Sequence, residues 1–544
     1  MRSSSLLGFF AAPLVLCAVP APAGAQEHAH QGTERLGKVV FPVSCNAAAR
    51  QGFERAMALL HSFWWEEGER AFQAVAAADS TCAMAYWGLA LVRWRNPIAG
   101  GPGAADLQAG QEAARRAAAL GGRTARERDF IAAVGALYGD TGTVPNSARL
   151  RRYTGAMEGV HARNPTDPEA GIFFAIALAA SAPAGDTTFA QQRRAAAILN
   201  PLFRKHPDHP GLAHYLIHAN DTPQLAELGL EAARRYAEIA PTAPHAQHMP
   251  SHIFVRLGLW DETVRSNRAS YRAVAAAGGE AKRALTADQL HAMDYMVYAY
   301  LQTGRDSAAA AVVAEAQADT AGSAAQALVA AYNRNAMVAR LALERGRWAE
   351  AARLSFRPSP GTPAAEMVTR FARGVGAVRA GDTALARAEI SALAAIEAEL
   401  VRRGDPYWPR VTRVKQRALA AWLALAAGDT AGAVMGARLA ADSEDVVGKH
   451  AVTPGEVVPA RELEADLLLR LGRAPEARAA YAHVLALEPH RARSVFGTAR
   501  AAELAGDRAA ALAAYRDYLT LVEQADGDRP EFTAARAFVG QGSH

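Results

Sequence analysis

The stretch GRAPEARAAYAHVLALEP (472–489) decides the fold, because its glycine, small and aromatic positions return further along the chain. In GDRAAALAAYRDYLTLVE (506–523), Gly472, Ala477, Tyr481 and Leu485 recur as the same residue types, each 34 residues later. An offset of 34 residues is the period of a repeat made of two helices. Such units bury their apolar faces against their neighbours, so a stacked helical array is expected.

The same turn pattern extends upstream of this pair. A glycine-containing turn closes a helical segment at five further positions, namely Gly258, Gly304, Gly346, Gly381 and Gly428. Glycine adopts the left-handed conformation that ends a helix. The intervals between these turns vary, so the repeats are degenerate, and convincing strand patterns are absent. The sequence therefore predicts an all-α fold, a right-handed solenoid of antiparallel helix pairs like that of tetratricopeptide (TPR) repeats.

Composition and proline positions divide the chain into five parts. Residues 1–25 have the pattern of a secretory signal peptide, with Arg2 before an apolar stretch and cleavage after Ala25. Residues 26–44 are expected to form a flexible leader, and 45–441 a degenerate TPR-like array with a histidine-rich middle at 206–294. A linker loop at 442–459 and a C-terminal TPR pair at 460–540 complete the chain. We therefore expect a periplasmic or secreted protein without a membrane span.

Two cysteines, Cys45 and Cys82, remain once the signal peptide is removed. An even number of cysteines in an exported protein favours a disulfide. Two buried free thiols are the alternative.

The charge pattern is that of a solvated surface. The formal net charge is +5, and acidic residues are interspersed among basic residues that are almost all arginine. A nucleic-acid-binding protein would carry a dense basic patch or stripe. We therefore expect no nucleic-acid partner.

The histidines are the one feature of the sequence that suggests chemistry. Seven of the 16 histidines lie between His206 and His252, and two pairs, His214/His218 and His248/His252, have helical i, i+4 spacing. Two imidazoles one turn apart can share a metal ion. If the two helices are neighbours, the four residues could bind zinc or copper. Further candidate ligands or supporting residues are His61, His245, His291 and Asp294.

Other interpretations of the cluster remain open. Three prolines predict that Pro241–Pro250 is a non-helical loop, and neutral histidines could satisfy its backbone in a purely structural network. A metal-free pocket with histidine as general acid or base is a third interpretation. A helical metalloprotease motif requires a glutamate between its two histidines, and none lies between His214 and His218. The motifs G-x-S-x-G and C-x-x-C-H are also missing.

Several stretches resemble a family of exported bacterial TPR-containing proteins. They are LLHSFWWEEGERAF (59–72), CAMAYWGLAL (82–91), HPGLAHYLIHAND (209–221), HAQHMPSHIFVRLGLW (245–260) and LHAMDYMVYAYLQTGR (290–305). The resemblance implies a helical solenoid and export, and it implies no particular reaction. The expected function is thus an exported, non-enzymatic scaffold that binds a protein or peptide. The alternative is a zinc- or copper-binding protein, or a metal-dependent hydrolase, that uses the histidine cluster.

Overall fold

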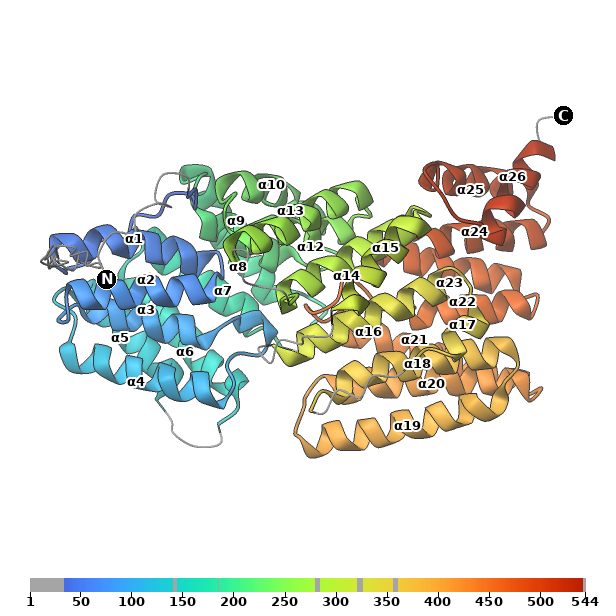
Figure 1. The fold of residues 1–544 in the computed structure, drawn as a ribbon, viewed down its shortest axis with the longest axis horizontal. Helices are drawn as coiled ribbons and strands as arrows, with labels where there is room; N and C mark the ends of the chain where they lie inside the picture. The colour runs from blue at the N-terminus through green and yellow to red at the C-terminus, as the bar shows by residue number, and fades with distance from the viewer. Residues whose placement is uncertain are drawn as a thin grey trace, which may run out of the picture. The chain divides into compact units, whose positions relative to one another are not determined.

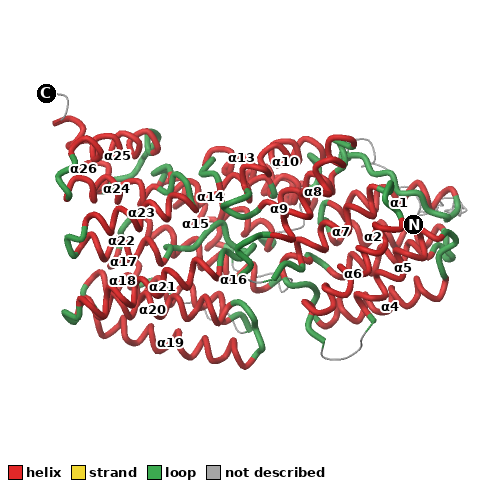
Figure 2. Tube along the Cα trace, turned by 180° about the vertical axis from the view of Figure 1, so that it is seen from behind, coloured by secondary structure: helices red, strands yellow, loops and turns green. Residues whose placement is uncertain are grey.

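The computed structural model describes residues 34–139, 144–183, 185–278, 284–319, 326–355 and 361–541. Helices joined by short connections make up these ranges, and no strand occurs in them (Figure 1; Figure 2). The predicted signal peptide lies outside the described residues. No helix in the described ranges is both long and apolar enough to cross a membrane.

The first half of the chain carries the helices that surround the histidines. They are α1 (Ala47–His61), α2 (Trp65–Ala78), α3 (Ala83–Trp94), the short 3-10 helix η1 (Pro97–Ala99), α4 (Ala104–Leu120), α5 (Ala125–Tyr138), α6 (Asn146–Arg163), α7 (Pro168–Ala180), α8 (Ala190–Lys205), α9 (Pro210–Asn220), α10 (Ala226–Ile239), α11 (Pro244–His248), α12 (Pro250–Arg256) and α13 (Trp260–Gly278).

The second half continues the series. Its helices are α14 (Ala287–Gln302), α15 (Asp306–Ala318), α16 (Ala327–Glu344), α17 (Trp348–Ala352), α18 (Pro363–Ala380), α19 (Thr383–Arg402), α20 (Trp408–Ala426), α21 (Thr430–Val447), α22 (Ala460–Arg470), α23 (Ala474–Leu487), α24 (Ala492–Leu504), α25 (Arg508–Leu521) and α26 (Pro530–Gln541). Most helices pack on the next helix in the chain, and many also contact the one after it. This arrangement confirms the predicted all-α, TPR-like solenoid.

The repeat positions have the structural roles that their residue types suggest. Gly472 and Gly506 have φ values of 73° and 75°, the left-handed region that suits glycine at the end of a helix. Tyr481 is buried, and a Cβ atom at Gly497 would lie 2.3 Å from its ring. The small residue on α24 therefore makes room for the tyrosine of the preceding repeat, which fixes how closely the two repeats stack.

Residues 36–43 are packed instead of forming part of a flexible leader. Leu36, Val39, Phe41 and Val43 are buried, and the ring of Phe41 lies 5.4 Å from that of Trp87. The expected linker at 442–459 also differs. Helix α21 extends to Val447, and the side chains that the following loop buries include those of Val452, Thr453, Val457 and Val458. Burial of apolar surface holds both segments against the helices.

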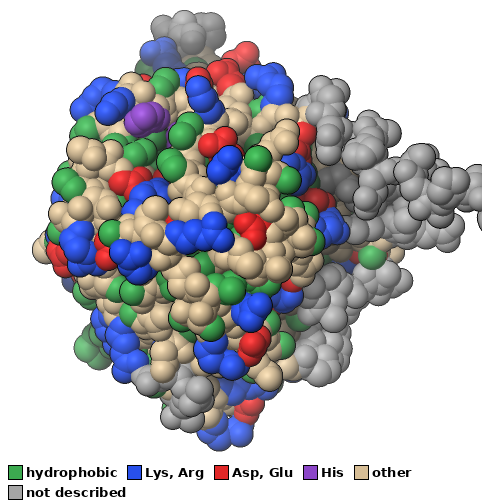
Figure 3. Space-filling view, turned by 90° about the vertical axis from the view of Figure 1, so that its left-hand side faces the viewer, with side chains coloured by type: hydrophobic (Ala, Val, Ile, Leu, Met, Phe, Trp, Pro, Cys, Tyr) green, Lys and Arg blue, Asp and Glu red, His purple; other side chains and the backbone are tan. Residues whose placement is uncertain are grey.

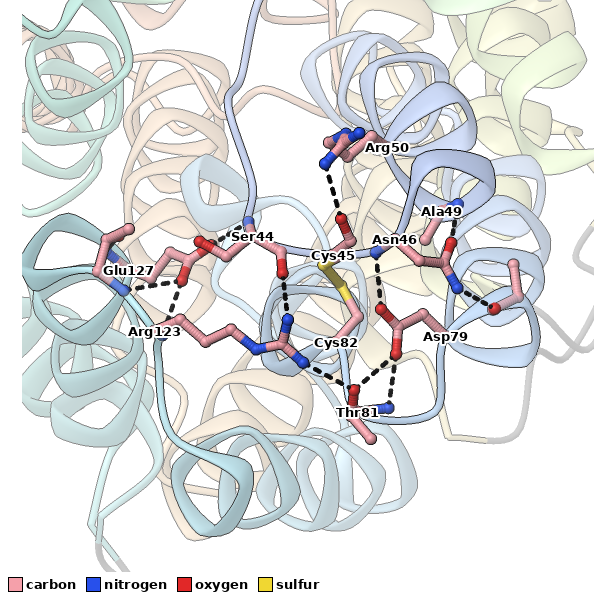
Figure 4. The surroundings of a disulfide bond; sticks show 12 residues. Ser44, Cys45, Asn46, Ala49, Arg50, Asp79, Thr81, Cys82, Arg123 and Glu127 are labelled. Carbon is pink, nitrogen blue, oxygen red and sulfur yellow. Dashed lines mark hydrogen bonds between the residues drawn. A yellow bond between two sulfur atoms is a disulfide. The ribbon is translucent and has the colours of Figure 1, made fainter.

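The predicted disulfide between Cys45 and Cys82 is present, with the Cα atoms 5.1 Å apart (Figure 4). It ties the segment before α1 to the start of α3. Hydrogen bonds surround it, including one from the Asn46 backbone N–H to Asp79 Oδ2 (2.8 Å) and one from the Arg123 guanidinium to the Ser44 carbonyl oxygen (2.9 Å).

Removing this disulfide should destabilise the protein. The bond closes a loop with a sequence separation of 37 residues. The double substitution Cys45→Ser/Cys82→Ser should lower the free energy of unfolding by about 3–4 kcal/mol, because the unfolded chain regains loop entropy. Urea denaturation of the two proteins measures the difference. An unchanged denaturation midpoint would show that the bond contributes nothing.

Charges of both signs are interspersed over the surface. The face seen in Figure 3 carries Lys and Arg side chains next to Asp and Glu side chains, without a large area of one sign. Among the surface ion pairs of the described residues is Arg194–Glu158, in which both side chains are about half exposed. Such pairs contribute little to stability.

Candidate metal centre

Prolines set the positions of the helices that carry the histidines. Pro210, Pro244 and Pro250 each occupy the first turn of a helix, α9, α11 and α12 respectively. A proline costs nothing there, because that N–H would lack a partner within the helix. The expectation of a non-helical loop at Pro241–Pro250 is therefore wrong. Met249 also has helical angles, so α11 and α12 follow each other with only a short break.

Three histidines form a first triad: His214 and His218 on α9, and His245 on α11. Their ligand nitrogens lie within 4.8 Å of one another. The Nε2 atom of each of the three rings is buried and has no hydrogen-bond partner. His214 Nδ1 lies 2.6 Å from the backbone carbonyl oxygen of His61. Because a carbonyl oxygen can only accept a hydrogen bond, Nδ1 carries the proton and donates it. Nε2 of the neutral His214 ring therefore carries a lone pair.

The segment around His61 is built for this contact. A Cβ atom at Gly211 would lie 2.5 Å from His61 Nδ1, so only glycine lets α9 approach α1 this closely. The ring of Tyr236 stacks on that of His214, with centroids 5.2 Å apart. Both contacts fix the orientation of His214.

A second triad consists of His248, His252 and His291 from α11, α12 and α14, and its ligand atoms again lie within 4.8 Å of one another. His248 Nε2 and His252 Nε2 are 3.0 Å apart. His252 Nδ1 donates to Asp221 Oδ2 at 2.9 Å, so its Nε2 atom carries a lone pair. The third residue, His291, has a buried Nδ1 atom without a partner.

The tautomer of His248 follows from its neighbour Asn267. The Nδ2 atom of Asn267 donates to the backbone oxygen of Thr263 at 2.8 Å, which directs its Oδ1 atom to His248 Nδ1 at 2.6 Å. His248 Nδ1 therefore carries the proton. Two lone pairs, on His248 Nε2 and His252 Nε2, thus face each other. Such a contact is repulsive unless a cation lies between the two rings.

Polar residues behind the ligands hold them in place. Asp221 accepts from His252 with one oxygen and from Arg256 Nε with the other, at 2.9 Å each. A carboxylate behind a histidine fixes the ring and makes its free nitrogen a better ligand, as is usual around bound metals. Asn267 does the same for His248.

The two triads are neighbours. His245 and His248 both lie on the short helix α11, and their ring centroids are 6.0 Å apart. The centroids of His218 and His252 are 6.5 Å apart. The two pairs predicted from helical spacing therefore belong to separate triads, which His245 and His291 complete. All six imidazoles lie in one region.

Two of the other candidates lie elsewhere. His61 Nε2 and His209 Nε2 each pair with one oxygen of Glu169 at 3.0 Å, and Tyr215 bonds the other His61 nitrogen at 3.1 Å. This third cluster supports His214 through the backbone of His61. Asp294 is fully buried and pairs with Arg340 at 3.0 Å.

Electrostatics keep the six rings neutral. Burial is the main cause that lowers the pKa of every one of them, and neighbouring histidines lower it further for all except His252. At His252, Asp221 opposes the effect of burial, and the pKa is still lowered. The pKa of His218 falls to about 3, and that of His291 also falls to about 3. In the third cluster, burial alone would raise the pKa of Glu169, but the charges of His61 and His209 hold it well below its usual range. Neutral imidazoles offer the lone pairs that metal binding requires.

The metal-free protein should lose stability in acid. In the unfolded chain each histidine takes up a proton near pH 6.5, whereas in the folded protein His218 and His291 do so only near pH 3. Between these values the unfolded state binds more protons, so unfolding is favoured by about 1.4 kcal/mol per pH unit for each such histidine. Melting temperatures of the metal-free protein at pH 8, 6.5 and 5 measure this. A flat profile would show that the histidines are not buried as neutral rings.

Sequence reasoning missed several residues of this region. Asp221 ends the motif HAND directly after α9, and His209 lies one residue before its first turn, so both were visible in the histidine-rich stretch. Glu169 on α7 and Asn267 on α13 carry no local signal, because only the stacking of distant helices brings them to the histidines.

Comparisons with known proteins find weak structural similarity alone. No family model and no curated protein matches the chain. Among solved structures, human IFIT1 with m7Gppp-AAAA is 11% identical over 81% of this chain and 90% of its own, with a TM-score of 0.39. Yeast Tom70 is 12% identical over 91% and 96% of the two chains, with a TM-score of 0.28. Both are helical-repeat proteins of the TPR type. Similarity at this level carries no statement about function.

Proposed function

We propose that this protein is a metalloprotein that holds two ions of copper or zinc, one in each histidine triad. The observation that carries the proposal is the triad of His214, His218 and His245: one ring nitrogen of each lies within 4.8 Å of the others, and all three Nε2 atoms are buried without a hydrogen-bond partner. A structural network would pair these atoms, since buried polar groups are nearly always hydrogen-bonded. The facing lone pairs of the second triad support the same proposal.

The ligand type favours copper or zinc. Imidazole suits these metals, whereas calcium and magnesium select oxygen ligands. Structural zinc sites use four protein ligands, while three histidines leave one position for water or a substrate. An ion held by these histidines would supply Lewis-acid chemistry toward a bound water, and copper would in addition supply electron transfer. The protein contributes neutral imidazole rings in fixed positions. The hydrogen bond from His252 to Asp221 makes the free nitrogen of His252 a better ligand.

Elemental analysis of paired variants tests this function. The wild-type protein, produced without a histidine tag, should contain about two ions per chain. His214→Ala/His245→Ala should lose the ion of the first triad, and His248→Ala/His291→Ala that of the second. His483→Ala is the matched control, because this histidine is about half exposed and lies outside both triads. Equal metal content in all four proteins, or none in the wild type after dialysis against copper and zinc, would refute the proposal.

We also propose export to an oxidising compartment. The buried disulfide between Cys45 and Cys82 supports it, because such bonds are rare in proteins of a reducing cytosol. Expression of the full chain in a bacterial host with mass analysis of the product is the test. A mature protein that begins at Gln26 is the expected result. Retention of residues 1–25 on the folded protein would count against export.

A scaffold role is a second candidate function, and one observation favours it. Met435, Leu439 and Val446 lie on one face of α21 and are 72%, 50% and 52% exposed. A photo-crosslinker at Leu439 should capture a protein partner in the native compartment, whereas one at the exposed Arg115 on α4 should not. Equal capture at both positions would contradict a specific surface.

A further inference from the structure

A cavity of about 290 Å³ lies next to the second triad. Its wall comes from distant parts of the chain: the α7–α8 and α9–α10 connections, the end of α12, the end of α21 with the loop after it, and parts of α22 and α23. Asp221 and Arg256 belong to this wall, and Asp221 is also the partner of His252. The cavity is therefore one residue away from a proposed metal ligand.

The cavity has a buried cation that lacks an acceptor. The Lys449 side chain is only 6% exposed, and its Nζ atom has no hydrogen-bond partner. The nearest carboxylate oxygen, Asp221 Oδ2, lies 3.6 Å away and already accepts from His252. Asp221 Oδ1 accepts from Arg256. Burying an ammonium group without hydrogen bonds is unfavourable in free energy. An oxygen acceptor from outside the chain could accept from its three N–H groups.

Two further donors on the same wall are also unpaired. Thr222 Oγ1 and Arg461 Nε are buried and have no partner. The acids of the wall are already engaged: Glu456 with Lys415, Asp445 with Arg461, and Glu488 with the Tyr298 hydroxyl. One acceptor on the wall, Gln192 Oε1, is also buried without a partner. The unpaired hydrogen-bonding groups of the cavity are thus mainly donors, which suits an oxyanion.

The remaining lining limits the kind of oxyanion. Phe189, Val484 and Leu487 give the cavity an apolar side. Burial, with the nearby Glu456, raises the pKa of Glu444 above its usual value, which lowers the negative charge of this part of the wall. Asp221, Asp445 and Glu488 still surround the cations with negative charge, which disfavours a doubly charged phosphate. A single carboxylate group attached to an apolar body matches both features.

We propose that this cavity binds a small monocarboxylic acid, whose carboxylate lies on Lys449 and Thr222 and whose apolar part lies against Phe189 and Leu487. None of the donors of this site is a proposed metal ligand, so benzoate binding can be tested without metal, although Asp221 connects Lys449 to His252. A bound carboxylate would add a second negative charge near Lys449. Asp221 would then keep its hydrogen bond to His252 without also having to neutralise Lys449. The ligand would thereby act on the second triad without touching it.

Calorimetric titration of the metal-free protein with benzoate tests the site. Benzoate should bind, while benzyl alcohol and inorganic phosphate should not. Lys449→Met should weaken benzoate binding by about tenfold or more, because it removes a charged hydrogen bond. Thr222→Val should weaken it less, and Lys205→Met on the outside of α8 is the control that should not change it. The melting temperature of each variant shows whether it is folded.

Three outcomes would overturn the proposal: no benzoate binding by the folded wild type, equal binding by folded Lys449→Met, or preference for phosphate. A failure of this site leaves the metal proposal untouched, since metal content is measured separately. Conversely, benzoate binding by a protein that takes up no metal would support the cavity alone.

Discussion

Removal of the two proposed metal ions should lower the melting temperature of this protein. The six imidazoles converge only in the folded chain, so a bound ion stabilises the folded state alone. At a free metal concentration of 1,000 times the dissociation constant, each site adds about 4 kcal/mol. Melting with and without a chelator measures the difference, and returning copper or zinc should restore the original value.

The quadruple variant His214→Ala/His245→Ala/His248→Ala/His291→Ala is the control for this experiment. It should melt at the same temperature with and without chelator, because both triads are broken. A chelator effect that persists in this variant would place the stabilising metal elsewhere. No chelator effect in the wild type would argue that the histidines form a hydrogen-bonded structural network.

Loss of Arg491 should be the most destabilising single substitution in the C-terminal half. The fully buried Arg491 donates to Glu462 at 2.8 Å and to Glu344 at 2.7 Å, and to the Tyr298 hydroxyl at 3.1 Å. It thus joins α24 to α14, α16 and α22. Arg491→Met leaves the buried Glu344 without its cation, and it leaves Glu462 with Arg493 alone, 3.5 Å away. This should cost about 3–5 kcal/mol. Chemical denaturation measures the loss.

An exposed ion pair supplies the matched control. Arg478 and Asp507 are 3.5 Å apart and about half exposed, so Arg478→Met should cost less than about 1 kcal/mol. Adding Glu344→Gln and Glu462→Gln to Arg491→Met should recover part of the loss, because the unpaired charges are then gone. Equal destabilisation by Arg491→Met and Arg478→Met would contradict the role of the buried network.

The helical-repeat architecture could be predicted from the sequence because it depends on local signals. The 34-residue offset from Gly472 to Gly506 reflects one glycine per turn, and the left-handed angles at both positions follow from the same cause. The disulfide was predictable from cysteine number and from the export pattern. The expected non-helical loop was wrong at Pro244, which begins a helix instead of preventing one. Pro250 lies in the first turn of a helix, as its position between His248 and His252 suggested. Proline in a first turn and proline in a loop have the same local sequence.

The grouping of the histidines could not be read from spacing. His245 and His248 are three residues apart on one helix, yet they belong to different triads. Which ring meets which depends on the stacking of α9, α12 and α14, and degenerate repeats do not fix that rotation. For the same reason Lys449, in a loop expected to be a linker, was not connected with Asp221.

The most direct test of the central claim is the position of the metal itself. Diffraction from crystals of the copper- or zinc-loaded protein, measured at the absorption edge of that metal, locates each ion. We expect two peaks, each about 2.0–2.1 Å from three imidazole nitrogens, one bounded by His214, His218 and His245 and the other by His248, His252 and His291. Peaks confined to surface residues, or none in either triad of the folded protein, would contradict the account.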